Sequence, residues 1–78
     1  MTVAWDEEVD ARGLLCPLPV LRARRRVAAL PPGGTLRLLT DDPAATVDVP
    51  FYCTEAGLTL VACDDLGRSA RAWMIRRG

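Results

Sequence analysis

The run Pro31-Pro32-Gly33-Gly34 restricts the fold of this 78-residue chain more than any other feature of its sequence. Prolines and paired glycines do not continue a helix, so a helix that approaches this run must end there. Before the run, apolar residues recur at helical spacing, at Val20, Ala23, Val27 and Leu30. After it, residues 35–40 have the composition of a strand, which we expect to be central in a sheet. The run therefore separates a helix from a strand.

The first half of the chain contains a further strand before this helix and the start of a further helix after the strand of residues 35–40. We expect a strand over residues 3–9, with Val3, Trp5 and Val9 as its main apolar residues. A second helix should follow residue 42, because Asp42 suits the N-cap and Pro43 suits the first helical position. This helix should extend to about residue 55.

The second half contains two more strands. Pro50 should kink the second helix or split it in two, and Gly57 should end it. Strands are then expected over residues 58–63 and 70–75, joined by a hairpin loop over residues 64–68. The order β-α-β-α-β-β predicts an α/β fold of the α+β two-layer sandwich type, in which both helices cover one face of a mixed four-stranded sheet. We interpret residues 1–78 as one domain.

The composition excludes several classes of function. Ten basic residues balance ten acidic ones, which argues against general nucleic-acid binding. The chain has no histidine, and its three cysteines show no C-x-x-C spacing, so we expect no metal and no cofactor. We find no signal peptide and no apolar run long enough for a membrane span. A cytoplasmic protein with free thiols is the simplest interpretation.

Cys16 is the candidate reactive residue. It lies in the run Gly13-Leu14-Leu15-Cys16-Pro17-Leu18-Pro19, where Pro17 suits the first helical position and Cys16 the N-cap. The positive end of the helix dipole should favour the thiolate, and Arg12 and Arg22 should add positive potential. Pro17 and Pro19 should hold the thiol in one place.

The other cysteines and polar residues have simpler interpretations. Cys53 and Cys63 are expected to be structural, and Asp42 to be a helix cap with a secondary role in docking a partner. Leu18 and Leu21 lie off the apolar stripe and near Cys16, so they are candidates for a transient protein interface. Arg12 and Arg22 are further candidates for docking.

Three segments carry a family resemblance. The pattern Asp10-x-x-Gly13-x-x-Cys16-Pro17-x-Pro19, the segments 41–44 and 50–53, and the closing segment 73–78 together resemble the TusA/SirA-type sulfur carrier family. The resemblance implies that Cys16 accepts sulfane sulfur as a persulfide. The donor would be a cysteine desulfurase or a rhodanese-like enzyme, and an acceptor protein would receive the sulfur. Relatives serve tRNA thiolation, molybdenum-cofactor metabolism or sulfur oxidation.

Two alternative functions remain open from the residues alone. The arginines of the first helix, Arg22, Arg25 and Arg26, could make the protein a non-enzymatic interaction or regulatory module. Cys16 could instead belong to a thiol redox switch, with Cys53 or a cysteine of another molecule as the resolving thiol.

Overall fold

The computed structural model describes residues 4–78, and its elements follow the predicted order. They are β1 (Glu7–Asp10), α1 (Leu18–Ala28), β2 (Thr35–Thr40), α2 (Ala45–Ala56), β3 (Thr59–Gly67) and β4 (Ala70–Arg76). The order β-α-β-α-β-β is therefore confirmed. Val3, which we expected in the first strand, lies outside the described residues.

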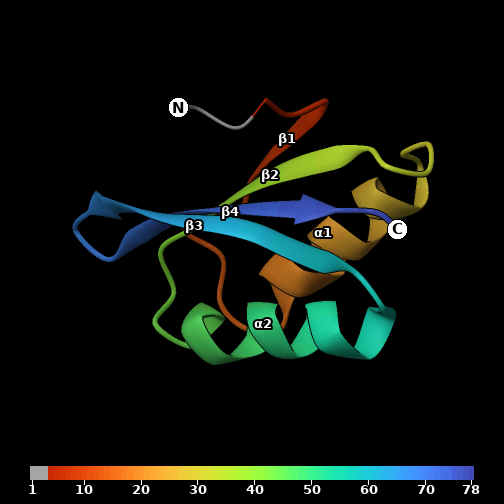
Figure 1. Ribbon diagram of the computed structural model, residues 1–78. Coiled ribbons are helices and arrows are strands. Elements are labelled where there is room, and N and C mark those ends of the chain that lie inside the picture. The colour runs from red at the N-terminus through yellow and green to blue at the C-terminus, as the bar shows by residue number, and fades with distance from the viewer. Residues whose placement is uncertain (1–3) are drawn as a thin grey trace.

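The strands form one mixed sheet in the order β1-β2-β4-β3. β1 is parallel to β2, whereas β4 is antiparallel to both β2 and β3. A parallel pair needs a crossover connection, and α1 supplies it between β1 and β2. Both helices lie below the sheet in Figure 1. The two-layer sandwich and the central position of β2 are confirmed.

The core fills the space between the sheet and the two helices. Leu36 and Leu38 of β2 are in register with Ile75 and Trp73 of β4, and all four side chains are buried. The helices complete the same cluster with Ala23, Val27, Ala45, Val49, Tyr52 and Cys53. Helices of this length are marginal in isolation, so this apolar packing holds them in place. It also sets the positions of their N-termini, where the candidate site lies.

The first strand is shorter than we expected. β1 begins at Glu7, and Trp5 lies outside it with its ring 4.7 Å from the Arg37 guanidinium. Of the predicted apolar residues of this strand, Val9 is buried, whereas Trp5 is 40% exposed. Trp5 therefore packs on Arg37 through the face of its ring, an attraction between a cation and a π system. Asp6 continues the contact with β2, because its backbone N–H donates to the Thr35 carbonyl at 2.8 Å.

The hairpin between β3 and β4 is tighter than we expected, and the predicted loop over residues 64–68 is wrong. Asp64 and Asp65 pair with Ala72 and Arg71 inside the sheet. The turn is made by Arg68 and Ser69, which have positive φ angles of 53° and 66°. Two residues of positive φ match the right-handed twist of paired strands. Strand pairing thus outweighs the polar character of the aspartates.

The second helix differs from the prediction at its start and at Pro50. Ala44, and not Asp42, is the N-cap of α2, and the helix continues unbroken through Pro50. Proline removes one backbone N–H, yet the buried residues around it keep the helix against the sheet. The end is confirmed, because Gly57 follows the helix with a φ of 68°.

Candidate functional site

The loop that carries Cys16 is tied to the loop that follows β2. The backbone N–H of Gly13 donates to Asp41 Oδ1 at 2.8 Å, and the backbone N–H of Cys16 donates to Asp42 Oδ2 at 2.7 Å. Gly13 has a φ of 82°, which other residues rarely adopt. Two carboxylates and one glycine turn therefore fix the backbone around the thiol.

Cys16 lies one residue further from the start of α1 than we expected. Pro17, and not Cys16, is the N-cap of α1, which begins at Leu18 with Pro19 in its first turn. The Cys16–Pro17 peptide bond is cis. Pro17 and Pro19 have no N–H groups, so the helix end offers the thiol fewer donors than an ordinary N-terminus. The predicted N-cap position of Cys16 is wrong.

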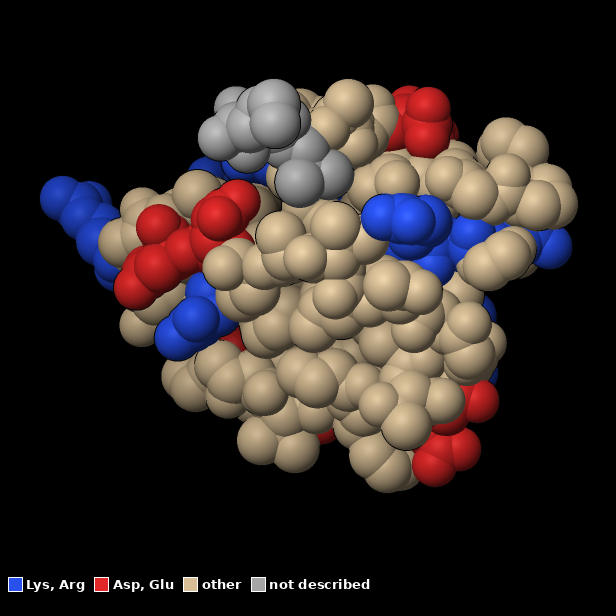
Figure 2. Space-filling view, in the orientation of Figure 1, with Lys and Arg blue, Asp and Glu red and all other residues tan. Residues whose placement is uncertain are grey.

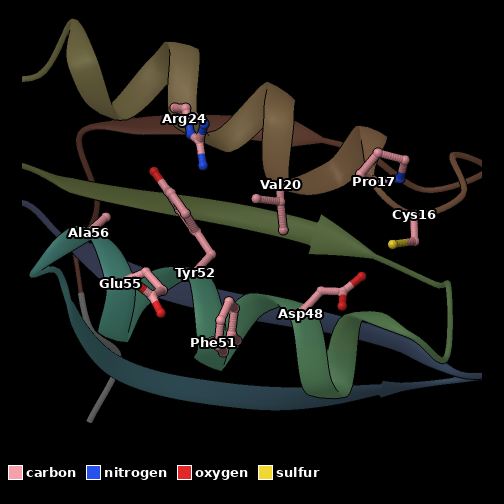
Figure 3. Close-up of a pocket in the computed structure, with 9 residues that line it drawn as sticks. All are labelled: Cys16, Pro17, Val20, Arg24, Asp48, Phe51, Tyr52, Glu55 and Ala56. Atoms are coloured by element: carbon pink, nitrogen blue, oxygen red, sulfur yellow. The ribbon is translucent and has the colours of Figure 1, made fainter.

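An open groove of about 680 Å³ runs from Cys16 between the two helices. In Figure 3, Cys16 and Asp48 lie at one end, and Arg24, Tyr52 and Glu55 lie toward the other. Val20, Phe51 and the other apolar residues form its walls. The Arg24 guanidinium lies 5.6 Å from the centre of the Tyr52 ring. The thiol is therefore exposed at the end of a largely apolar groove.

The electrostatic setting of Cys16 is the opposite of the one we expected. A hydrogen bond to the Asp48 carboxylate raises the pKa of the Cys16 thiol, and desolvation and the negative charges of Asp48 and Asp42 raise it further. An anionic acceptor stabilises the protonated thiol, because ionisation would place two negative charges side by side. The predicted preference for the thiolate in the free protein is wrong.

Neither of the two arginines that we expected near the thiol lines the groove. Arg12 donates to both carboxylate oxygens of Asp10, at 2.9 and 2.7 Å, and this pairing lowers the pKa of Asp10 to about 2. Arg22 instead lines a separate hollow of about 350 Å³ with Val9, Arg25 and Arg26. Both remain candidates for docking, but the predicted positive potential at Cys16 is wrong.

Comparison with known proteins identifies the family of this chain. Residues 7–76 match the model of the family described as sulfurtransferase TusA. The chain belongs to the TusA family. It therefore has the role of a sulfurtransferase-type sulfur carrier that works with partner proteins in sulfur relay.

A solved structure supports the fold of this TusA family member. The crystal structure of a SirA-like protein from Desulfitobacterium hafniense superposes with a TM-score of 0.83 at 24% sequence identity. The match covers 94% of this chain and 99% of that one. At this level of identity the likeness concerns the fold. Within residues 4–78, no helix combines the length and the apolar character that crossing a membrane requires.

The surface around the groove of this TusA family member is apolar. Leu18 and Leu21, the two leucines that we proposed for docking, are 46% and 44% exposed. Val47 and Phe51 are more exposed still. In Figure 2, uncharged surface covers β3 and most of α2, whereas acidic side chains lie at the lower right and basic side chains interrupt the face above β3.

Asp48 is the site residue that the sequence reasoning missed. It lies in the first turn of α2, and its carboxylate faces the sulfur of Cys16 in Figure 3. No short motif links the two residues, because Cys16 lies in the loop before α1 and Asp48 lies in α2. The one signal that the sequence offered for this contact was the acidic character of residues 41–48, which contain Asp41, Asp42 and Asp48.

The other cysteines differ from Cys16 in their surroundings. Cys53 is buried in the core, where desolvation raises its pKa, so it cannot act as a resolving thiol without a change of packing. Cys63 is exposed on β3, where the Arg71 guanidinium lies 4.0 Å from its sulfur. Neither cysteine lines the groove.

Proposed function

We propose that Cys16 accepts a sulfane sulfur from a donor protein, holds it as a persulfide and passes it to an acceptor protein. The observation that carries this proposal is the placement of Cys16. Its thiol is exposed, its backbone N–H is held by Asp42, and it lies at the end of a groove open to a partner. Membership of the sulfurtransferase TusA family supports this proposal.

The transfer needs no oxidant or metal. The Cys16 thiol loses its proton, and the thiolate attacks the outer sulfur of the donor's persulfide. A bond forms between Cys16 Sγ and that sulfur while the donor's S–S bond breaks. The electron pair leaves with the donor cysteine, which takes up a proton. The same exchange in the other direction passes the sulfur to the acceptor.

The donor that suits this chemistry is a cysteine desulfurase or a rhodanese-like enzyme. We propose that it docks on the surface beside the groove, where Leu18 and Leu21 are exposed. Arg12, Arg22 and Asp42 are the polar candidates for the same contact. A reducing compartment such as the cytoplasm keeps the thiol available between transfers.

The test is sulfur loading followed by intact-protein mass spectrometry. Incubation with a cysteine desulfurase and cysteine should add the mass of one sulfur atom, and Cys16→Ser should abolish this gain. Cys63→Ser is the matched control, because Cys63 is also exposed but lies away from the groove. Loss of the gain in Cys63→Ser or Cys53→Ser, with Cys16→Ser unaffected, would place the carrier thiol elsewhere.

A further inference from the structure

The thiol of Cys16 is surrounded by negative charge. Cys16, Asp42 and Asp48 together line a small hollow where the two helices begin. Asp48 reaches the sulfur from α2, whereas Asp42 holds the Cys16 N–H from the loop after β2. Two carboxylates from different segments therefore meet at one exposed cysteine.

The residues that the structure describes place no cation at this end of the groove. Their ion pairs join Arg12 to Asp10, Arg26 to Glu7 and Arg37 to Glu8. Elsewhere along the groove the titratable groups are Arg24, Tyr52 and Glu55. Arg24 stacks on Tyr52 toward the far end. The groove thus has two carboxylates, Asp48 and Glu55, for one guanidinium, and the thiol lies at its acidic end.

This arrangement conflicts with the chemistry that sulfur transfer needs. The thiolate is the nucleophile, and the carboxylate of Asp48 favours the thiol. The chain has no histidine that could take the proton. Carboxylates in general are poor bases for a thiol, because the ordinary pKa of a carboxyl group lies several units below that of a thiol. Activation must therefore come from outside the chain.

We propose that Asp48 holds the Cys16 thiol in its protonated form in the free protein, and that a cationic side chain of the sulfur-exchange partner releases it by pairing with the Asp48 carboxylate. The inference rests on the proposed carrier function and names the chemistry of the partner. The partner carries an arginine or lysine close to its sulfur-bearing cysteine. Such a side chain fits the open, acidic end of the groove.

Sulfur exchange at Cys16 begins when the partner binds. The partner's cation pairs with Asp48, and the hydrogen bond from the Cys16 thiol is lost. The thiol proton passes to water, and the thiolate attacks the outer sulfur of the partner's persulfide. The partner's S–S bond breaks, and its cysteine leaves with the electron pair and is then protonated. When the partner departs, its cation leaves the groove and Asp48 faces the sulfur again.

The first test measures the ionisation of Cys16 in the free protein. In a Cys63→Ser background, the rate of alkylation by iodoacetamide is recorded against pH. Asp48→Asn should lower the pH midpoint, because a neutral side chain no longer opposes the thiolate, and alkylation at neutral pH should be about tenfold faster. Asp48→Glu should keep the original midpoint, and so should the exposed control Asp64→Asn. An unchanged midpoint in Asp48→Asn would overturn the proposal.

The second test measures the response to a cation on the sulfur donor. Two short peptide persulfides are compared, one with arginine beside its cysteine and one with glutamine there. The wild-type protein should take up sulfur about tenfold faster from the arginine peptide, because a cation paired with Asp48 removes its opposition to the thiolate. Asp48→Asn should take it up from both peptides at similar rates. Equal rates with the wild type, or an undiminished preference in Asp48→Asn, would contradict the proposal.

The two tests separate this inference from the carrier function. If Cys16 gained no sulfur from either peptide or from a desulfurase, the carrier function would fail, whatever the alkylation midpoints. If Cys16 gained sulfur from both peptides with no effect of Asp48, the carrier function would stand and the role of Asp48 would fail. Circular dichroism of each variant confirms that it is folded.

Discussion

Asp42 shows how one carboxylate can join two loops. Its Oδ2 accepts the N–H of Cys16 at 2.7 Å, and its Oδ1 accepts the N–H of Ala44 at 3.2 Å. The residue has the side chain of a helix cap but is placed two residues before the N-cap of α2. Its main structural contribution is therefore to hold the backbone of the reactive cysteine against the start of the second helix.

Asp42→Ala should loosen the Cys16 loop. Loss of a hydrogen bond to a charged group should lower the free energy of unfolding by about 1–2 kcal/mol, measured by chemical denaturation. The Cys16 amide should exchange its hydrogen faster, and sulfur loading of Cys16 should slow. Asp64→Ala, an exposed change on β3, is the control. Unchanged exchange at the Cys16 amide in Asp42→Ala would show that this hydrogen bond does not order the loop.

Among the elements, α1 has an unusual C-terminal end. It lacks a glycine of positive φ at its C-cap, which is Ala29. Instead the Arg77 guanidinium, from the segment after β4, donates to the carbonyls of Ala28, at 3.1 Å, and of Leu30. Backbone carbonyls at a helix end lack intrahelical partners, and a basic side chain can satisfy them. The C-terminal end of the chain therefore completes the first helix.

Arg77→Ala should destabilise the protein through the end of α1. The uncovered carbonyls should lower the free energy of unfolding by about 1–2 kcal/mol in urea denaturation. Arg76→Ala is the matched control, because Arg76 is exposed at the end of β4 and should change stability by less than about 0.5 kcal/mol. Equal effects of the two changes would mean that Arg77 acts through its charge alone.

At the scale of the whole molecule, stability depends on the contact between the sheet and both helices. β2 is central, and its Leu36 and Leu38 are fully buried. The same layer holds the starts of α1 and α2 side by side. Cys16, Asp42 and Asp48 come from three segments and meet only because both helices pack on one face.

Leu38→Ala should therefore affect the entire fold. The cavity left in the core should lower the free energy of unfolding by about 2–5 kcal/mol, measured by chemical denaturation. Leu66→Ala is the control, because Leu66 is 45% exposed on β3 and leaves no cavity. A loss in Leu38→Ala no larger than in Leu66→Ala would show that the layer between sheet and helices is not the main source of stability.

The sequence alone was sufficient to predict the order of the elements, though not the exact starts of the two helices. The proline and glycine runs and the apolar periodicity predicted the order of the elements, the central strand and the end of α2 at Gly57. They also placed Cys16 in a turn between a strand and a helix. These features depend on backbone preferences and on side-chain spacing within one segment, which can be read without knowing the neighbours.

Only the tertiary structure decided the rest. Pairing with β4 extends β3 through Asp64 and Asp65. Such pairing is a contact between two segments, so the composition of one segment does not reveal it. The tertiary structure also decided the electrostatic setting of Cys16. The backbone N–H of Cys16 donates to Asp42, which is 26 positions away along the chain. Arg12, close in sequence, pairs with Asp10, whereas Asp48 reaches the thiol from α2. Charges act through space, so the ionisation of Cys16 depends on packing.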